Sequence, residues 1–422
     1  MQGVTNCIAF FSLLAMAGLA MAQPDEAAPS LDLETAITQA LAENPALKAA
    51  GYQMQIQEAR IEQAAIKPRP RLQVDVEDVF GSGQNDLLRG TQSTASIVWI
   101  LERGVRDSRI SAVRARSSLV ESDIAIQRLD VAAETARRYM ESLDLEARLE
   151  IATEGIELGA AAVTAIERRV NAGSAPPADL IRARADLRRL ELVEENIAHE
   201  LVSANYRLAA QWGDNEPAFD RVRGDLLDIP QIEGFTNFES RLDQNPDLER
   251  YLTANRVNEA QLRFEQASNR QPWSVGAGFR WLNKESDHSF VASLSIPLGP
   301  EDSNRGRVAE ARARITQSQM EREAERLRLR TELFVLYQEL MHSVHLTEAL
   351  EQDILPLYES ALEQTQAAYE AGRYSYLEWS ASQMNLLNAR NDLAAAASSI
   401  RRNLIEIERL TGVSVEAPHL SQ

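Results

Sequence analysis

The sequence predicts a mainly α-helical protein built from two copies of one unit, each carrying a short β-hairpin that forms part of a membrane β-barrel. Three motifs each occur twice, in the same order, at offsets of 201, 198 and 199 residues. A period this long lies far outside the roughly 20–50 residues of solenoid repeats, so it indicates one duplicated unit of helix, β-hairpin, long helix and helix. The matching segments are Leu41–Leu47 with Leu242–Leu248, Arg109–Arg116 with Arg307–Arg314, and Ala172-Gly173 plus Asp179 with Ala371-Gly372 plus Glu378.

The repeat and the N-terminus together suggest how the chain is divided. Residues 1–22 lack charged side chains and hold an apolar stretch followed by Ala20-Met21-Ala22, which predicts a secretory signal peptide, with a buried N-terminal helix as the alternative. The single cysteine, Cys7, lies in this segment, so we expect no disulfide, catalytic thiol or cysteine-linked lipid in the mature chain. We expect a first repeat at 23–212, a linker at 213–234, a second repeat at 235–412 and a tail at 413–422.

Composition and motifs argue against several functional classes. The 422 residues carry 63 Asp and Glu against 44 Lys and Arg, a formal net charge of −19, and nucleic acid is a poor partner for such a chain because phosphate binding requires clustered cations. The sequence contains no Ser/His/Asp grouping, phosphate-binding glycine loop or metal-spaced cluster. We therefore expect no enzyme activity, no cofactor and no resident metal. No further stretch approaches 18 apolar residues, so no membrane-spanning helix is expected.

Each half opens with a predicted helix of about 35 residues. In the first half it runs from about Leu33 to Ile66 and ends at Lys67-Pro68-Arg69-Pro70, because proline cannot donate to the helical ladder and restricts the residue before it. Arg69 and Arg71 either bind lipid headgroups or are solvated flanking residues.

Strands are predicted next in each half. Apolar and polar residues alternate with a period of two, so each strand has one apolar and one polar face. Runs of roughly 9–11 residues with a lipid-facing side and aromatic residues near the ends are typical of transmembrane β-strands. Two hairpins packed on a soluble core would give the same alternation. The strands are expected at about 71–80, 92–101, 273–281 and 289–298.

Three tryptophans distinguish these two interpretations. Trp99, Trp273 and Trp281 lie on the apolar faces of the predicted strands. They are membrane-interface anchors if the strands belong to a barrel, and core residues if the hairpins pack on a soluble body.

A very long helix follows the strands in each half, over about 106–171 and 307–371. Gly173 and Gly372 occupy the position just past the helix end where glycine adopts the left-handed conformation. Returning helices follow at about 177–212 and 375–411. The opening and returning helices of one half are together about as long as the uninterrupted helix, so we expect two short helices stacked end to end beside one long helix.

Four strands are too few to close a barrel. In lipid every backbone donor and acceptor must be paired, so an open sheet edge is not viable. The smallest membrane barrels have about eight strands, and several chains must therefore contribute to one barrel. Two chains would give eight strands and three would give twelve; the larger barrel leaves a water-filled passage.

Together these features resemble the TolC family of outer-membrane efflux proteins over essentially the whole mature chain. The resemblance rests on the duplicated unit, on Asn44-Pro45 and Asn245-Pro246, and on the Ala-Gly pairs followed by an acid six residues after glycine. It implies a trimer in which a twelve-stranded outer-membrane barrel continues into a twelve-helix periplasmic coiled-coil tunnel. The segment Leu72–Gly83 is similar to the first hairpin of the CzcC-like branch, which serves resistance–nodulation–division (RND) pumps for heavy-metal cations.

The candidate functional positions lie near the two helical turns. The resemblance implies that Glu378 belongs to an acidic ring at the periplasmic entrance and that Asp179 takes part in inter-helix tethering. Like charges around a narrow pore favour cations. Alternatively, both acids only complement the positive N-termini of the returning helices. His342 and His345 share a helix face. They either bind a metal ion together or, because no third ligand is nearby, are ordinary surface residues.

We interpret the chain as a passive exit duct of a tripartite efflux system. It would lie in the cell outer membrane and extend into the periplasm, against outer-membrane lipid. As a homotrimer it would receive substrates, heavy-metal cations among them, from an inner-membrane RND pump through a periplasmic adaptor docked at the tips near Gly173 and Gly372. The alternative is a soluble periplasmic coiled-coil adaptor or scaffold, which predicts helical hairpins without lipid-facing strands.

Overall fold

The computed structural model describes residues 30–79, 90–283, 287–298 and 304–412. The signal peptide expected at 1–22, the hairpin loop around Gly81 and the expected tail at 413–422 lie outside the described residues. Among the described residues, none of the helices combines the length and hydropathy needed to cross a bilayer.

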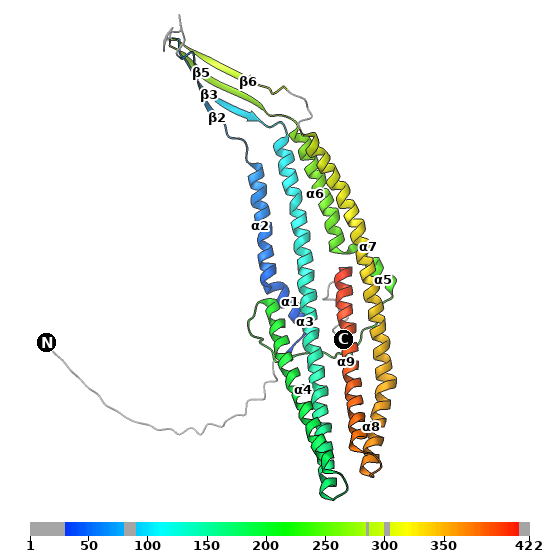
Figure 1. Cartoon of the computed structure of the whole chain (residues 1–422). Helices are drawn as coiled ribbons and strands as arrows, with labels where there is room; N and C mark the ends of the chain where they lie inside the picture. Colours follow the sequence, from blue (N-terminus) through cyan, green and yellow to red (C-terminus); the bar gives the residue numbers. More distant parts are fainter. Residues whose placement is uncertain (1–29, 80–89, 284–286, 299–303, 413–422) are drawn as a thin grey trace, which may run out of the picture.

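The molecule is an elongated bundle of helices with a β-sheet at one end and two helical turns at the other (Figure 1). The first half contains β1 (Ser30–Leu31), α1 (Leu33–Glu43), α2 (Pro45–Ala65), β2 (Arg71–Glu77), β3 (Gln92–Leu101), α3 (Val105–Asn171), α4 (Pro177–Ala209) and the short helix η2 (Ala210–Trp212). After β4 (Arg221–Val222), the second half contains α5 (Phe235–Arg241), η3 (Leu242–Gln244), α6 (Pro246–Ser268), β5 (Trp273–Leu282), β6 (Asp287–Ser295), α7 (Arg305–Ala349), η4 (Leu350–Ile354), α8 (Leu355–Glu370) and α9 (Tyr376–Thr411).

The two long helices differ in continuity. Helix α3 is unbroken over 67 residues, which at 1.5 Å per residue is about 100 Å. The second long helix, predicted without a break over 307–371, instead contains the π-helical turn η4 between α7 and α8. Pro356 follows this turn directly. Proline lacks the N–H that would bond the carbonyl four residues earlier, and its ring clashes with that carbonyl, so a wider turn relieves the conflict.

The expected 35-residue opening helix is wrong in one respect, because it is divided at an asparagine. Asn44 separates α1 from α2, and Asn245 separates η3 from α6. The side-chain oxygen of each asparagine accepts hydrogen bonds from two backbone N–H groups of the helix that follows, which is an N-cap. Proline stands at the first position of each helix, where its missing N–H is not needed.

The same asparagines join the short helices end to end, as the length argument predicts. The amide nitrogen of Asn44 donates to the carbonyl of Gln211 at 2.7 Å, and that of Asn245 donates to Leu410 at 2.7 Å. Each bond links the start of an upper helix to the end of a returning helix, so α2 continues into α4 and α6 into α9 along the long helices (Figure 1).

The sheet unites strands from both halves in the order β2-β3-β5-β6, with every neighbour antiparallel. The second-half hairpin differs from the expected bounds, because β6 begins at Asp287 and ends at Ser295 rather than spanning 289–298. Pro297 follows this end and cannot donate to a ladder. Strand β2 likewise ends at Glu77, before Asp78, whose φ is 56°.

A small two-stranded sheet, which the sequence did not predict, fixes the linker to the middle of the bundle. Strand β1 pairs in parallel with β4. Tyr139 of α3 is 1% exposed and donates its hydroxyl to the carbonyls of Leu31, at 3.1 Å, and Arg223. The largest core cluster surrounds this point and joins α1, α3, the linker and α9.

Candidate functional site

Two regions hold the residues selected from the sequence: the sheet at one end and the helical turns at the other (Figure 1). In the sheet, the register aligns apolar residues in rows across all four strands. One row joins Val74, Ala95, Phe279 and Phe290. Phe279 and Phe290 are 67% and 66% exposed and meet edge to face, with ring centroids 5.9 Å apart. Large apolar side chains on this face are therefore open to the surroundings, instead of covering a core.

The opposite face of the sheet is polar. Arg280 donates to Thr94 Oγ1 at 2.9 Å and to Gln92 Oε1 at 3.2 Å, and it pairs with Glu77 at 3.3 Å. Gly278 lies on the same side, where an added Cβ would be 2.2 Å from the carbonyl oxygen of Ala95. The strands can approach closely there because this position has no side chain.

The three tryptophans lie on the apolar side, in agreement with the alternation. Trp99 and Trp281 are 41% and 51% exposed, and Trp281 stacks on His288, with centroids 6.4 Å apart. Trp273 is half-buried at the start of β5, where the Arg103 guanidinium lies 4.6 Å from its ring centroid. The three rings therefore lie near the two ends of the apolar face, with Trp99 and Trp273 toward the helices and Trp281 toward the opposite end.

At the other end, both helical turns have the same backbone. Gly173 and Gly372 have φ of +72° and +74°, a conformation that costs residues with a Cβ about 1–2 kcal/mol. Ser174 N–H donates to Arg169 O at 2.8 Å, and Arg373 N–H donates to Ala368 O at 2.9 Å. Each glycine N–H also donates to the carbonyl three residues earlier, at 3.0 Å for Gly173 and 2.9 Å for Gly372. Together these bonds form the Schellman motif that closes helix C-termini.

The two acids near these turns have different surroundings. Glu378 belongs to a capping box, in which its Oε2 accepts hydrogen bonds from Ser375 N–H at 2.7 Å and Ser375 Oγ at 3.0 Å. These bonds lower the pKa of Glu378 below its ordinary value. Asp179 also occupies the third position of its helix, but the preceding cap residue is Pro176, which makes no side-chain cap hydrogen bond. Both acids lie in the first turn of a returning helix, as the helix-terminus interpretation requires, and Glu378 in addition makes capping bonds.

An aromatic cluster that sequence reasoning missed joins the two hairpins just above the turns. Tyr369, Tyr376 and Trp379 of the second half are buried together with Ile166 and Ala183 of the first. Tyr369 stacks on Trp379, with centroids 5.1 Å apart, and the rings of Tyr376 and Trp379 meet edge to face. The available signal was the three-residue spacing of Tyr376 and Trp379, which places both rings on one side of α9. Tyr369 lies on α8 and meets them across the turn at Gly372.

Polar contacts tie this aromatic cluster to the first half. Tyr376 donates its hydroxyl to Asp186 Oδ2 of α4 at 2.9 Å. Arg169 of α3 lies 4.6 Å above the Tyr369 ring and donates to the Tyr369 carbonyl. Burial raises the pKa of Tyr369, and the nearby Asp179 carboxylate raises it further, against the Arg169 cation. The structure thus brings Asp179 electrostatically close to the second hairpin, whereas Glu378 bonds to its own helix.

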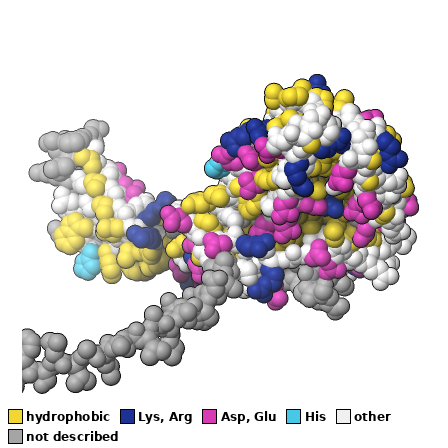
Figure 2. Space-filling model, turned by 90° about the horizontal axis from the view of Figure 1, so that it is seen from below, with side chains coloured by type: hydrophobic (Ala, Val, Ile, Leu, Met, Phe, Trp, Pro, Cys, Tyr) yellow, Lys and Arg dark blue, Asp and Glu magenta, His cyan; other side chains and the backbone are white. Residues whose placement is uncertain are grey.

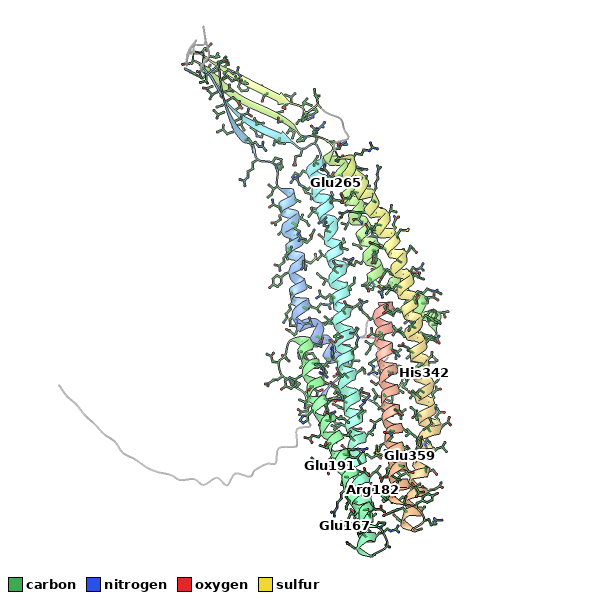
Figure 3. All side chains as sticks on the ribbon, in the orientation of Figure 1. Glu167, Arg182, Glu191, Glu265, His342 and Glu359 are labelled. Carbon is green, nitrogen blue, oxygen red and sulfur yellow. The ribbon has the colours of Figure 1, made fainter. Side chains whose placement is uncertain are left out.

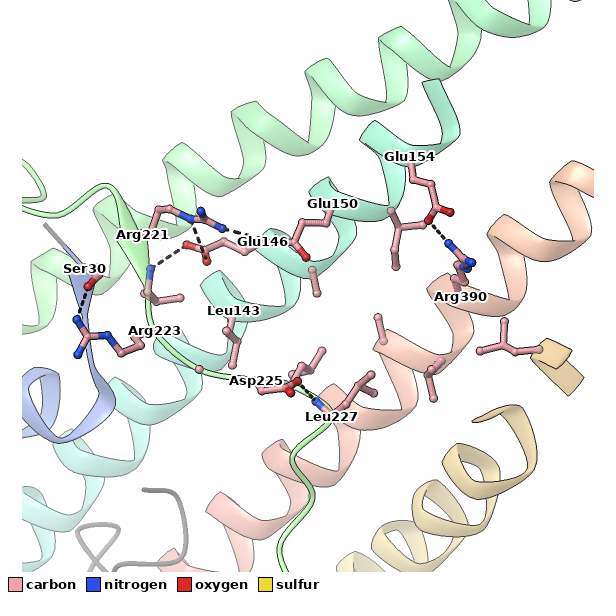
Figure 4. A pocket seen from close by; sticks show the side chains of 18 residues that line it. Ser30, Leu143, Glu146, Glu150, Glu154, Arg221, Arg223, Asp225, Leu227 and Arg390 are labelled. Atoms are coloured by element: carbon pink, nitrogen blue, oxygen red, sulfur yellow. Dashed lines mark hydrogen bonds and ion pairs between the residues drawn. The ribbon is translucent and has the colours of Figure 1, made fainter. Parts of the chain in front are cut away.

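Midway along the bundle a crevice of about 880 Å³ lies between α3, α9 and the linker (Figure 4). Its acids are engaged with neighbouring groups. Glu146 accepts from Val222 N–H at 2.8 Å, and burial raises its pKa. Glu150 pairs with Arg221 at 3.5 Å, and Glu154 pairs with Arg390. We therefore interpret the crevice as the place where ion pairs join the linker and the two halves.

The two histidines considered as a metal pair lie on the surface of α7. His342 and His345 are exposed on α7, and Figure 3 places His342 far from the turns, where Glu167 lies. His342 borders an open groove together with the cation Arg402. Within the described part of the chain, no group of three or more His, Cys, Asp or Glu side chains is placed to hold a metal ion.

Comparison with known proteins gives consistent matches along the chain. Residues 36–214 and 240–413 match the family model described as outer membrane efflux protein. The cobalt-zinc-cadmium resistance protein CzcC of Cupriavidus metallidurans is 27% identical over 394 residues, which cover 92% of each chain.

Solved structures have the same fold. The crystal structure of CusC matches with a TM-score of 0.68 at 19% identity, covering 90% of this chain and 91% of that one. The outer membrane protein VceC from Vibrio cholerae matches with a TM-score of 0.70 at 16% identity, covering 90% of this chain and 96% of that one.

Proposed function

This chain belongs to the outer membrane efflux protein family, and from that premise we propose that it forms a homotrimeric exit duct for heavy-metal cations. The family places the protein in the cell outer membrane, as an efflux channel that reaches into the periplasm and works within a tripartite pump. The alternative of a soluble periplasmic adaptor is thereby excluded, as the outward-facing Phe279 and Phe290 also indicate.

The observation that supports assembly of several copies is that the sheet has two free edges. Strands β2 and β6 each pair on one side only within the described chain. Unpaired backbone groups are not tolerated in lipid, so β2 of one copy pairs with β6 of the next. Three copies give twelve strands, with the apolar rows toward lipid and Arg280, Thr94 and Glu77 toward the water-filled interior.

The cargo proposal rests on the CzcC relative and on the acidic character of the chain. CzcC is named for resistance to cobalt, zinc and cadmium. The chain here has a formal net charge of −19, and carboxylates around an aqueous passage attract cations. We propose that Asp179 and Glu378 of three copies form acidic rings near the periplasmic tip, where they favour cations over anions. In this arrangement Glu378 of each copy keeps its capping bonds to Ser375.

The partners are assigned by the position of the turns. The tips around Gly173 and Gly372 are the ends farthest from the sheet (Figure 1), and they reach deepest into the periplasm. We propose that a periplasmic adaptor docks there and connects the duct to an inner-membrane RND pump. Exposed apolar residues next to the turns, Ile181 at 70% and Leu377 at 65%, provide part of that contact.

A matched pair of substitutions tests the membrane orientation. Phe290 and Ser289 are neighbours on β6 and face opposite sides of the sheet. Phe290→Arg should abolish recovery of the trimer from outer membranes, because an arginine facing mid-bilayer lipid costs about 2–4 kcal/mol in each copy. Ser289→Arg should assemble normally, since its side chain enters the aqueous interior. Equal trimer yields from the two variants, measured by native mass spectrometry, would overturn the proposed orientation.

The cargo is tested by deletion. Loss of the chain should lower tolerance to cobalt, zinc and cadmium salts, and the wild-type gene should restore it. Affinity purification after cross-linking should recover an adaptor and an RND pump. If metal tolerance stays unchanged while tolerance to organic toxins falls, the duct remains but the metal assignment is wrong.

A further inference from the structure

Cations gather where the sheet passes into the helices, in a chain that is acidic overall. The four junctions 66–71, 102–109, 269–272 and 304–307 contain nine Lys and Arg but only two acids. Glu301 and Asp302 add two acids next to the last junction, outside the described residues. The junctions therefore stay positive although the whole chain carries −19.

Three of these cations hold the helices at the junctions. Arg106 donates to Ala65 O at 2.8 Å, and Arg109 donates to Ala64 O at 3.0 Å, so both satisfy carbonyls at the end of α2. Arg307 pairs with Glu265 at 3.0 Å at the end of α6 (Figure 3). These contacts explain why the Arg109 and Arg307 motifs recur in the sequence.

The other six cations make none of these contacts with helix ends, and we call them the basic collar. All six are exposed. Within the described part of the chain, none of them forms an ion pair with a carboxylate. Their charge is thus available to an external anion. The basic collar consists of Lys67, Arg69, Arg71, Arg103, Arg270 and Arg305.

Two junctions are packed against each other, so the collar crosses from one half to the other. Arg103, after β3, donates to the carbonyl of Gln271, before β5, at 3.3 Å. Arg270 of the second half reaches back to Gly104, where an added Cβ would be 4.0 Å from its Nη1. The guanidinium groups of both halves therefore lie over the same joint.

The collar borders the apolar face of the sheet directly. Arg103 stacks on Trp273, and Arg71 precedes Leu72, which is 74% exposed. On the face seen in Figure 2, dark blue Lys and Arg side chains gather at the neck between the sheet and the helical body, beside yellow apolar side chains. Cations at the boundary of a lipid-facing surface lie at headgroup depth, where long basic side chains and tryptophan are both favoured.

We propose that the basic collar binds the phosphate groups of anionic phospholipids in the leaflet on the helix side of the outer membrane. Arginine offers forked N–H donors that match phosphate oxygens, and each cation near an anionic lipid surface strengthens binding about fivefold. A bilayer presents many phosphates at one depth, which suits six cations spread around a joint better than a single free phosphate does. The inference rests on the outer-membrane location and is independent of the proposed cargo.

The test compares lipid retained by the detergent-purified full-length protein. Native mass spectrometry counts phosphatidylglycerol bound after titration, with phosphatidylcholine as the zwitterionic comparison of zero net charge and inorganic phosphate as a competitor. The quadruple variant Lys67→Gln, Arg69→Gln, Arg71→Gln and Arg270→Gln should lower the apparent affinity for phosphatidylglycerol at least tenfold. Wild-type protein should prefer phosphatidylglycerol, and millimolar phosphate should not displace it.

The matched control removes four exposed cations at the opposite end of the bundle: Arg168→Gln, Arg182→Gln, Arg189→Gln and Arg373→Gln. It changes the net charge equally and should retain phosphatidylglycerol as wild type does. Should the collar variant fail to assemble, the pair variants Arg69→Gln/Arg71→Gln and Arg270→Gln/Arg305→Gln each remove two of the six cations, and each should lose about a third of the binding free energy that the collar supplies. Equal retention by the collar and control variants, equal binding of the two lipids, or displacement by phosphate would each overturn the proposal. If the wild-type protein is recovered from outer membranes while the lipid test fails, the collar proposal is wrong but the outer-membrane duct is unaffected.

Discussion

The two halves of the chain share a backbone plan but differ in the side chains that complete it. Both long helices end in a Schellman turn at glycine, and both upper helices begin with proline after a buried asparagine. Yet α3 is continuous, whereas its counterpart contains η4, and Glu378 caps its helix, whereas Asp179 follows Pro176 and does not. Backbone chemistry at a few special residues therefore preserves the duplicated fold, while the remaining positions are free to diverge.

Placing a proline in α3, at the position that matches Pro356 of the second half, should have the largest effect on stability. By the 199-residue offset, Pro356 corresponds to Glu157, which is exposed on α3. Glu157→Pro should lower the free energy of unfolding by about 3 kcal/mol or more, because the unbroken helix loses a hydrogen bond and gains a clash. Thermal unfolding followed by circular dichroism measures the change. Pro356→Ala should change stability by less than about 1 kcal/mol, since η4 already relieves that site; similar losses from both would mean that the π turn has another cause.

Replacing the capping asparagines should have the next largest effect on stability, and the loss should be greater in the second half. Asn245 is fully buried and Asn44 is 8% exposed. Asn245→Ala should cost about 2–3 kcal/mol, because it removes a helix cap and leaves the Leu410 carbonyl without its donor. Asn44→Ala should cost about 1–2 kcal/mol, since water can reach the exposed groups. A larger loss at Asn44, measured by chemical denaturation, would contradict this ranking.

One acid with a buried carboxylate oxygen should give the second half a pH-dependent stability. Glu408 occupies the position of Ala209 in the first half, and its Oε2 has no hydrogen-bond partner within the described residues. Burial raises the pKa of Glu408 from 4.5 to about 7. A raised carboxyl pKa favours the folded state at low pH, and this contribution is lost as pH rises from about 4.5 through about 7. Glu408→Gln should therefore raise stability by about 1 kcal/mol at pH 8 and leave it unchanged at pH 4; a gain that does not depend on pH would refute the assignment.

The two turn glycines should respond alike. Gly173→Ala and Gly372→Ala should each cost about 1 kcal/mol, because both glycines have positive φ. The space around each position is open or limited only by the flexible Arg169 side chain, so strain in the backbone is the common cause. Gly306→Ala, at a glycine without positive φ and with open surroundings, is the control and should be neutral or stabilising. Unequal losses at the two turns would indicate that the surrounding contacts, rather than φ, decide the cost.

The smallest effect should come from the capping carboxylate. The pKa of Glu378 is lowered below 4.5 by its bonds to Ser375, so its contribution to stability is present above pH 4.5 and is lost as pH falls below that value. Glu378→Gln should slightly lower the unfolding temperature at pH 7 and have no effect at pH 3. A loss of equal size at pH 3 and pH 7, measured by thermal unfolding of Glu378→Gln, would refute the capping role of this carboxylate.

Much of the fold could be predicted because its causes are local. Alternation assigned the strand faces, prolines and glycines marked helix ends, and the repeated motifs revealed the doubled unit. The strand at 92–101 and the helix ends at Gly173 and Gly372 agree with the structure. One error has a local cause as well: Asn44 caps a new helix and Pro45 begins it, so the opening helix is divided. The bond from Asn44 to Gln211, 167 residues away, decides only which helix α2 continues.

The sequence by itself determined the doubled helical unit, the lipid-facing alternation and the family, because periodicity and special backbone residues act over a few neighbours. Only the tertiary structure decided that one sheet joins both halves, that Tyr369, Tyr376 and Trp379 join the hairpins, and that cations of both halves lie over one joint. These features depend on which distant segments the packed helices bring together, and no local pattern specifies that.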